Sequence, residues 1–180
     1  MKLAFVYAGQ GSQHVGMGKD FYEEFPSFSE IFDCVPVDFN LKQLCFEGPE
    51  EQLAQTRYTQ PCMAAFAVGV TDLLYREGVR PQAAAGLSLG EYSALYAAGV
   101  FSRGTVISTV ALRGRVMEEA AQGLDCGMTA VLGLDRERLR EACEGAAELG
   151  TVQICNYNCP GQLVIGGEKA AVDRAGELAK

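Results

Sequence analysis

Residues 81–99, PQAAAGLSLGEYSALYAAG, give the clearest indication of the fold. The short apolar segment 81–86 predicts a strand, and the apolar run from residue 91 predicts a buried helix. Between them stands the pentapeptide GLSLG (residues 86–90), whose outer glycines permit a sharp bend and a close approach of the backbone. A G-x-S-x-G turn between a strand and a helix lifts its serine above the sheet edge. Ser88 is therefore a candidate nucleophile.

Two interpretations of this turn stay open at the level of the residues. In the functional one, the N-terminus of the following helix stabilises a developing oxyanion, with the backbone N–H of Leu89 as donor. In the structural one, Ser88 is an ordinary helix N-cap between glycines. A nucleophilic serine also needs a base, usually histidine. The chain has one histidine, His14, which precedes the turn and lies in a glycine-rich loop.

The pattern on either side of the turn predicts two domains. Residues 2–7 predict a first buried strand, so strand, glycine turn and helix occur twice in the first part of the chain, as is typical of an α/β domain. A long apolar helix is expected to open at Thr59. The later part alternates as β-α-β-β-α, which lacks one strand of a ferredoxin-type split βαβ sandwich. We expect domains at 1–122 and 123–180.

Composition excludes several classes of protein. The chain has 180 residues, of which 48% are hydrophobic and 21% charged, and this excludes a disordered or collagen-like chain. A net charge of −8 removes the basic footprint that nucleic acid requires, and no apolar stretch is long enough to span a membrane. Seven cysteines without zinc-type spacing are typical of buried thiols in a reducing compartment. We therefore expect a cytoplasmic protein that binds neither nucleic acid nor membrane.

Arg113 is the second candidate functional residue. On a helical wheel that begins at Val106, it falls with Met117 in the middle of the apolar stripe, whereas Arg115 falls on the opposite face. A guanidinium on a buried face is costly unless an anion pairs with it, and its fork geometry suits a carboxylate. That anion is either a substrate carboxylate or an internal acid such as Glu91.

A glycine turn, GQGSQ at residues 9–13, follows the first expected strand. It fails the dinucleotide-binding pattern G-x-G-x-x-G because His14 stands where the third glycine is required. Backbone N–H groups in this turn could supply a second oxyanion donor, as a loop after an early strand does in hydrolase-type folds. The alternative is a generic tight turn.

Five segments, taken in order, resemble the malonyl-CoA:acyl carrier protein transacylases and the related acyltransferase domains of fatty acid and polyketide synthases. The segments are LAFVYAGQGSQHVGMG, YTQP, GLSLGEYSALYAAG, ALRGRVM and NYNCPGQLVIGG, and together they cover essentially the whole chain. The resemblance implies an α/β fold, with an α/β-hydrolase-like large domain and a ferredoxin-like small subdomain, and with the C-terminal part missing.

The resemblance also implies roles for single residues. Ser88 matches the family's nucleophile, and the backbone amides of Gln10 and Leu89 match the oxyanion donors. Arg113 matches the arginine that binds the malonyl carboxylate. Two further residues match positions near the acyl pocket, namely Gln60 and Met117.

The implied reaction is a ping-pong transfer that uses no metal and no tightly bound cofactor. Malonyl-CoA, the substrate, would acylate Ser88, and the phosphopantetheine thiol of acyl carrier protein would then take up the malonyl group. Acyl carrier protein is thus the expected partner, and fatty acid biosynthesis the expected pathway.

Three departures from the family pattern bear on this expectation. Ala8 replaces a frequent proline, and Leu87 replaces the histidine that usually precedes the nucleophile. The family's general-base histidine follows the small lobe, beyond residue 180, so we expect this chain to be poorly active alone. Two alternatives stay open: an α/β-hydrolase-type esterase, which has no use for Arg113, and a non-enzymatic fragment or half of a split acyltransferase.

Overall fold

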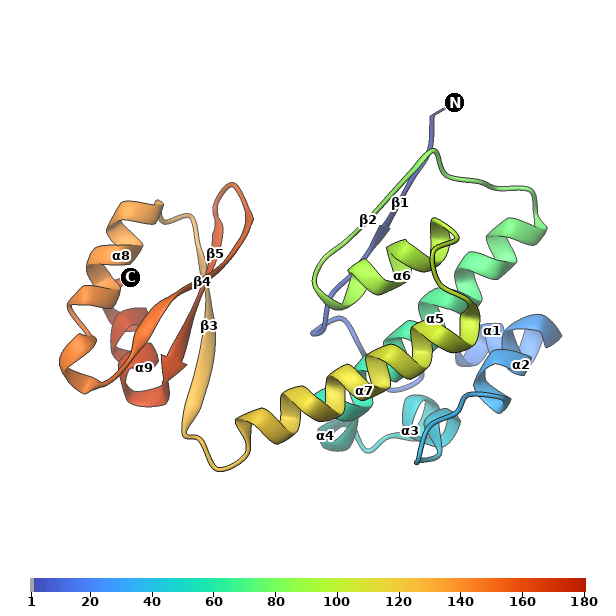
Figure 1. The fold of residues 1–180 in the computed structure, drawn as a ribbon, viewed down its shortest axis with the longest axis horizontal. Coiled ribbons are helices and arrows are strands. Elements are labelled where there is room, and N and C mark those ends of the chain that lie inside the picture. Colours follow the sequence, from blue (N-terminus) through green and yellow to red (C-terminus); the bar gives the residue numbers. More distant parts are fainter. Residues whose placement is uncertain (1) are drawn as a thin grey trace. The chain divides into compact units, whose positions relative to one another are not determined.

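The chain is divided near residue 120 into two units, each built around its own apolar core (Figure 1). The computed structural model describes residues 2–180. The first unit is Met1–Ala120 and the second is Ala121–Lys180. The two units together have the expected α/β character, with a hydrolase-like strand–turn–helix in the first and a ferredoxin-like β-α-β-β-α order in the second.

The first unit contains a parallel pair of strands, β1 (Ala4–Tyr7) and β2 (Ala83–Gly86). Their register pairs Ala4 with Ala83 and Tyr7 with Gly86, so both strands deliver their carboxyl ends to the same edge. Parallel strands require a long crossover between them, and a series of helices supplies it. The strand expected at residues 2–7 thus forms over its last four residues.

Helices make up most of the first unit. The crossover between the strands consists of α1 (Lys19–Glu24), α2 (Pro26–Asp33), α3 (Leu41–Glu47), α4 (Glu50–Leu53) and α5 (Thr56–Arg76). Two helices follow the second strand, α6 (Leu89–Ala97) and α7 (Arg103–Ala121). The long apolar helix expected from Thr59 begins three residues earlier, at Thr56. Ser102 caps α7, since its Oγ accepts a hydrogen bond from the Thr105 N–H at 3.2 Å.

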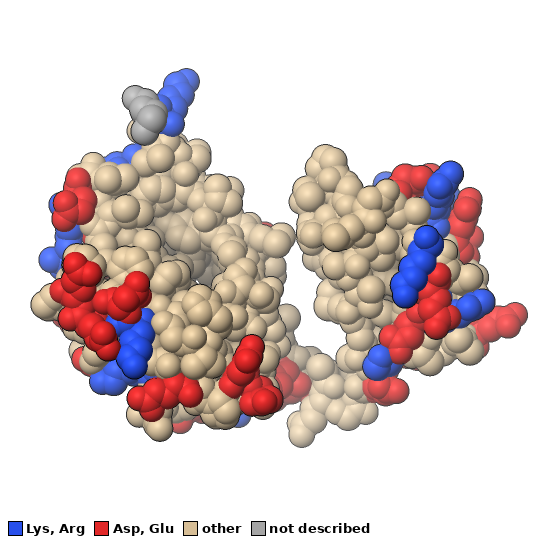
Figure 2. All heavy atoms as spheres, turned by 180° about the vertical axis from the view of Figure 1, so that it is seen from behind, with Lys and Arg blue, Asp and Glu red and all other residues tan. Residues whose placement is uncertain are grey.

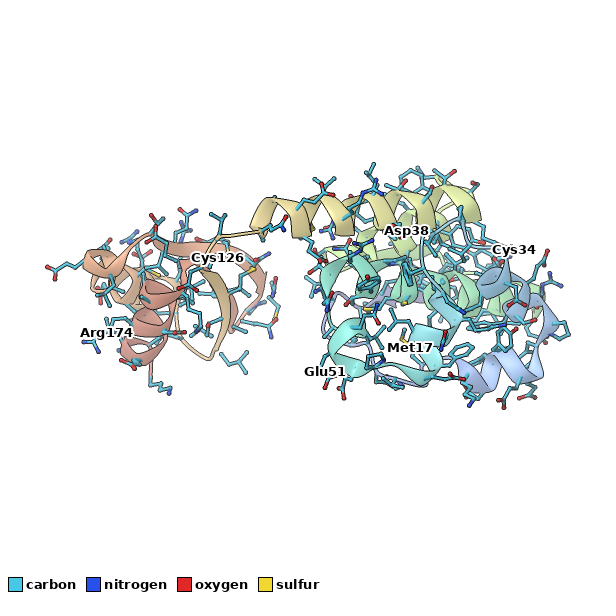
Figure 3. The ribbon with its side chains drawn as sticks, turned by 90° about the horizontal axis from the view of Figure 1, so that it is seen from below. Met17, Cys34, Asp38, Glu51, Cys126 and Arg174 are labelled. Atoms are coloured by element: carbon cyan, nitrogen blue, oxygen red, sulfur yellow. The ribbon has the colours of Figure 1, made fainter. Side chains whose placement is uncertain are left out.

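The core of the first unit lies among its helices, where α2, α3 and α5 bury their apolar side chains together. Met17 lies inside this core, whereas Cys34 lies at the surface (Figure 3). One prediction about α6 was wrong: the helix is not buried all round. One side of α6 packs on the β1–β2 sheet. Leu95, on another side of the helix, is 38% exposed.

Two pairs of side chains join helix α5 to strand β1. The hydroxyl groups of Tyr7 and Thr71 are hydrogen-bonded at 2.7 Å, and the Phe5 and Tyr75 rings stack with centroids 6.2 Å apart. Burial, as the largest cause, raises the pKa of Tyr7. These contacts position the carboxyl end of β1, from which the GQGSQ turn leads toward the candidate site.

The second unit is an antiparallel sheet with helices on one face. Its elements are β3 (Cys126–Leu132), α8 (Arg136–Glu144), the 3-10 helix η1 (Ala147–Leu149), β4 (Val152–Cys159), β5 (Gln162–Glu168) and α9 (Lys169–Leu178). The strand order is β3-β5-β4. Helix α8 ends at Glu144, and β4 continues to Cys159 because Pro160 and Gly161 alone form the hairpin turn to β5.

Alternate residues of this sheet face the helices or the outside. Leu163 and Ile165 of β5 are buried against Leu139 of α8 and Val172 of α9. On the opposite face, large side chains such as Met128 are exposed. All seven cysteines are free thiols. Four are exposed, namely Cys34, Cys126, Cys155 and Cys159, and three are buried, namely Cys45, Cys62 and Cys143. Within residues 2–180, no helix combines the length and the apolar character that crossing a membrane requires.

Candidate active site

Ser88 stands in a strained conformation at the bend between β2 and α6. Its backbone has φ 52° and ψ −101°, and it is the one non-glycine residue with positive φ among residues 2–180. Such a conformation costs of order 1–3 kcal/mol and persists only where the surroundings enforce it. An ordinary N-cap has extended backbone and a side-chain bond to the helix, and Ser88 has neither. The structural interpretation of this serine is therefore not supported.

Glycines let three backbone segments meet under this bend. A Cβ at Gly86 would lie 2.0 Å from the carbonyl carbon of Gly90, and a Cβ at Gly90 would lie 2.3 Å from the Tyr7 oxygen. On the other side, a Cβ at Gly9 would lie 2.8 Å from the Leu87 oxygen. Contacts this short exclude any side chain. The turn after β1 is thus pressed directly against the turn that carries the serine.

This close approach places two free backbone donors around the Ser88 turn. Leu89 opens α6, so its N–H has no partner within the helix. Gln10 follows Gly9, and neither its N–H nor that of Leu89 has a hydrogen-bond acceptor among residues 2–180. Free N–H groups beside a helix N-terminus favour negative charge. The arrangement is chemically suited to hold an oxyanion formed at Ser88.

Arg113 of α7 reaches the serine directly. Its Nη2 donates a hydrogen bond to the Ser88 Oγ at 3.0 Å, although the two residues are 25 positions apart in sequence. Among the described residues, no carboxylate lies within 4.0 Å of this guanidinium, so the pairing with Glu91 that the sequence left open is absent. The guanidinium instead lies over the Tyr92 ring, 5.5 Å from its centroid. The candidate site therefore holds an uncompensated cation beside Ser88.

Helix α7 approaches the site closely because of the glycine next to Arg113. A Cβ at Gly114 would lie 2.8 Å from the carbonyl oxygen of Thr56, at the start of α5. The expected apolar stripe is correct at its first turns, where Val106 is fully buried, and wrong further along, where Met117 is 45% exposed. Arg113 is therefore half-buried rather than buried. The helix leaves the core at this point, so the guanidinium is accessible as well as oriented.

Gln60 of α5 contacts Met117, which lies on the same helix as Arg113. The Gln60 side chain is fully buried, and its Nε2 contacts the Met117 Sδ at 3.5 Å. The Gln60 Oε1 is buried without a hydrogen-bond partner among residues 2–180. A buried polar atom without a partner is uncommon and is often found where a ligand or water binds.

Sequence reasoning missed three residues, which contact Arg113, Gln10 and the first turn of α5, respectively. Tyr92 stands four positions after Ser88 on α6, a helical spacing that could have revealed it. Thr56 accepts a hydrogen bond from the Gln10 side chain at 3.1 Å. Glu118 accepts one from the Arg57 N–H at 3.0 Å and thereby caps α5. No spacing rule predicts the last two contacts, because each joins segments more than 40 residues apart. Within residues 2–180, no three His, Cys, Asp or Glu side chains gather as metal ligands.

A serine on a strand–turn–helix bend, next to free amide donors and a guanidinium, is an arrangement suited to acyl transfer. Comparison with known families agrees, since residues 4–179 match the acyl transferase domain, and the chain belongs to this family.

Its relatives are transacylases. The chain is 42% identical to the malonyl CoA-acyl carrier protein transacylase of Bacillus subtilis, over 99% of this chain and 57% of the relative. The fold matches the malonyl CoA-acyl carrier protein transacylase from Coxiella burnetii with a TM-score of 0.92 at 37% identity, covering 99% of this chain and 58% of that one. It also matches a complex of a type II PKS acyl-carrier protein with its malonyl-transacylase, with a TM-score of 0.91 at 40% identity, covering 99% and 59%. The chain thus spans somewhat under three fifths of the length of these relatives.

Proposed function

We propose that this chain carries the acyl-loading site of a malonyltransferase. In this proposal Ser88 takes a malonyl group from malonyl-CoA and passes it to the phosphopantetheine thiol of acyl carrier protein. The observation that carries the proposal is the 3.0 Å contact between the Arg113 Nη2 and the Ser88 Oγ. An arginine without a protein carboxylate, placed at a nucleophile, selects an acyl group that brings its own carboxylate.

The chemistry follows from this placement. The Ser88 Oγ attacks the thioester carbonyl carbon, the C–O bond forms, and the carbonyl oxygen becomes an oxyanion between the Gln10 and Leu89 N–H groups. Collapse of this intermediate breaks the C–S bond, and CoA leaves as the thiol with the serine proton. The free carboxylate of the resulting malonyl ester pairs with Arg113. The carrier thiol sulfur then attacks the ester carbonyl carbon through a second oxyanion at the same donors. The C–S bond forms, the C–O bond to the Ser88 Oγ breaks, and the thiol proton ends on the Ser88 Oγ.

The proton acceptor for Ser88 lies outside the contacts described above. The serine's hydrogen-bond partner is a guanidinium, which stays protonated and only donates. The family resemblance implies a histidine that follows the small lobe in the relatives. We therefore propose that malonyl transfer by residues 1–180 alone is slow. A histidine base contributes typically 10²–10⁴-fold, which sets the expected size of the deficit.

Intact-mass analysis after prolonged incubation with malonyl-CoA tests the proposal. The wild-type chain should gain one malonyl group, Ser88→Ala none, and the control Ser108→Ala as much as wild type. Arg113→Ala should lose the preference for malonyl-CoA over acetyl-CoA, and Arg115→Ala on the opposite face should keep it. Loading of Ser88→Ala, or an unchanged preference in Arg113→Ala, would contradict the assignment. Full-rate malonyl transfer by the 180-residue chain would contradict the separate proposal that the general base lies outside these residues.

A hydrolase for neutral esters is the weaker alternative. Its nucleophile would gain nothing from an adjacent unpaired guanidinium, because a neutral acyl group offers that cation no counter-ion. Equal cleavage of neutral and carboxylated esters would favour it.

A further inference from the structure

An exposed leucine directly precedes Ser88. Of the two leucines that flank the serine, Leu89 is 2% exposed and belongs to the core, whereas Leu87 is 47% exposed. Exposure alone assigns no function to Leu87, because uncharged residues occupy most of the first unit's surface in the view of Figure 2. Its position beside the candidate nucleophile and its fixed backbone set it apart from other exposed apolar residues.

The backbone of Leu87 is held by hydrogen bonds at both ends. Its N–H donates to the Tyr7 carbonyl oxygen at 3.1 Å, and its own carbonyl oxygen accepts from the Gly90 N–H at 2.9 Å. The side chain lies against the turn after β1, with its Cγ and Cδ2 3.4 and 3.6 Å from the position that a Cβ at Gly9 would take. An apolar side chain is thus fixed next to Gly9, the residue that precedes Gln10 with its free N–H.

The other side chains at this turn are polar. Arg113 donates to the Ser88 Oγ, and the carboxylate of a malonyl ester would pair with this guanidinium. The Gln10 side chain is hydrogen-bonded to Thr56, since its Nε2 donates to the Thr56 Oγ1 at 3.1 Å. Because Arg113 accounts for the charged end of the acyl group, Leu87 is left to contact the uncharged parts of the reactants.

We infer that Leu87 selects the acceptor of the acyl group by favouring an alkyl thiol over water. This inference rests on the proposed acyl transfer at Ser88 and concerns its second step. The thiol end of a phosphopantetheine arm brings methylene groups, which gain free energy by contact with an apolar side chain. A water molecule at the same place loses hydrogen bonds.

Two reactions of the malonyl ester compete. In thiolysis the C–S bond of a new thioester forms as the C–O bond to the Ser88 Oγ breaks. In hydrolysis a water oxygen attacks the same carbonyl carbon, the same C–O bond breaks, and malonate leaves. In both reactions a proton of the attacking group ends on the Ser88 Oγ. The ratio of thioester to malonate, here called the thiol-to-water ratio, therefore measures the choice of acceptor.

Pantetheine is the probe, because it presents the thiol arm without a carrier protein. The chain is loaded with malonyl-CoA, desalted and incubated at pH 8 with millimolar pantetheine or with buffer alone. A thiol with a pKa of about 8.5 is partly ionised at this pH, and the thiolate attacks without a base. Intact mass follows the loss of the malonyl group, and chromatography separates malonyl-pantetheine from malonate.

Leu87→Asn keeps the approximate size of the side chain and removes its apolar character. We expect faster hydrolysis and slower thiolysis, so that the thiol-to-water ratio falls about tenfold. Leu87→Ala should lower the ratio in the same direction, and the apolar variant Leu87→Met should keep it. A merely structural role of Leu87 would slow loading or change both reactions alike, and the ratio would stay constant.

Leu95→Asn is the matched control. Leu95 lies on α6 and is 38% exposed, so the same substitution is made at a comparable surface position away from the turn. This variant should keep the wild-type thiol-to-water ratio. Circular dichroism of each variant checks that it is folded.

An unchanged ratio in Leu87→Asn and Leu87→Ala would overturn the inference, and so would an equal fall in Leu95→Asn. Failure of the wild-type chain to load from malonyl-CoA would instead contradict the proposed function. The thiol-to-water ratio is then measured on the acetyl group that p-nitrophenyl acetate leaves on Ser88, located by peptide mapping. Absence of that acetyl group as well would overturn both proposals.

Discussion

Gly90 shows how closely the site depends on single residues. Its Cα faces the carbonyl oxygens of Tyr7 and Ala8, which a Cβ would approach to 2.3 and 2.8 Å. We predict that Gly90→Ala lowers the free energy of unfolding of the first unit by about 3 kcal/mol or more, because backbone must move to admit the methyl group. Urea unfolding followed by circular dichroism measures the change.

Gly104 provides the control for that substitution. It lies in α7 with no atom within 4 Å of an added Cβ. Gly104→Ala should therefore stabilise the chain, by up to about 1 kcal/mol, through helix propensity alone. Equal effects of the two substitutions would show that the close packing at Gly90 does not contribute to the free energy of unfolding.

Among single residues, the sequence predicted the sharp bend at Ser88 and the side of α7 on which Arg113 lies, but not their surroundings. The outer glycines of GLSLG predicted a sharp bend, and a helical wheel placed Arg113 on the side of α7 that faces Ser88. The wheel gave the direction of the side chain but overestimated its burial, since it assumed that α7 stays packed over its whole length. Thr56 was missed because its contact with Gln10 depends on tertiary structure alone.

At the scale of elements, α5 and α7 are joined at the α5 N-terminus. The Glu118 carboxylate accepts the Arg57 N–H and lies where the helix dipole is positive. We predict that Glu118→Ala costs about 1 kcal/mol of unfolding free energy, as loss of a helix cap does. Glu119→Ala is the neighbouring control, because its contact with Arg115 is exposed and 4.0 Å long. A loss in both variants alike would point to helix propensity or net charge instead of capping.

Helices α5 and α6 are joined by a second polar contact, with a consequence at high pH. Burial first, and then the hydrogen bond to the Asp72 carboxylate, raises the pKa of Tyr96. The folded chain therefore keeps this proton at pH values where the unfolded chain, with a tyrosine pKa of about 10, loses it. The contribution to stability is constant below pH 10 and is lost as the pH rises above that value.

Tyr96→Phe isolates this effect. At pH 8 it should cost about 1.5–3 kcal/mol, the range for hydrogen bonds to charged groups. Between pH 8 and pH 11 the variant should lose less unfolding free energy than wild type does, as measured by urea titration at each pH. An identical alkaline loss in the two proteins would exclude Tyr96 as its source.

At the scale of the whole molecule, the two units have separate cores, and each can be perturbed by itself. Leu139 is fully buried in the core of the second unit. Leu139→Ala should lower the stability of residues 121–180 by about 2–5 kcal/mol, as cavity-forming substitutions do. Faster hydrogen exchange at the β5 amides Leu163 and Ile165 measures this loss. Unchanged exchange there would contradict the importance of this core.

The order of elements in both units followed from the sequence, because strand, glycine turn and helix each have a local signature. Boundaries were less accurate where tertiary contacts decide them. Tyr157 and Cys159 continue β4 because they pair with β5, although the turn-forming residues 158–161 are typical of an earlier end at Asn156. The 81% exposure of Val6 in β1 had no local signature at all, since the segment 4–7 has the composition of a strand buried on both sides.

The buried cysteines allow local unfolding to be measured separately in each of the two units. Cys45 and Cys62 are concealed in the first core, and Cys143 is concealed in the second. Proximity to Cys45 and burial raise the pKa of Cys62, and burial raises that of Cys143, so both resist alkylation while enclosed. A timed pulse of iodoacetamide, followed by peptide mapping, would therefore record how often each half exposes its interior under native conditions.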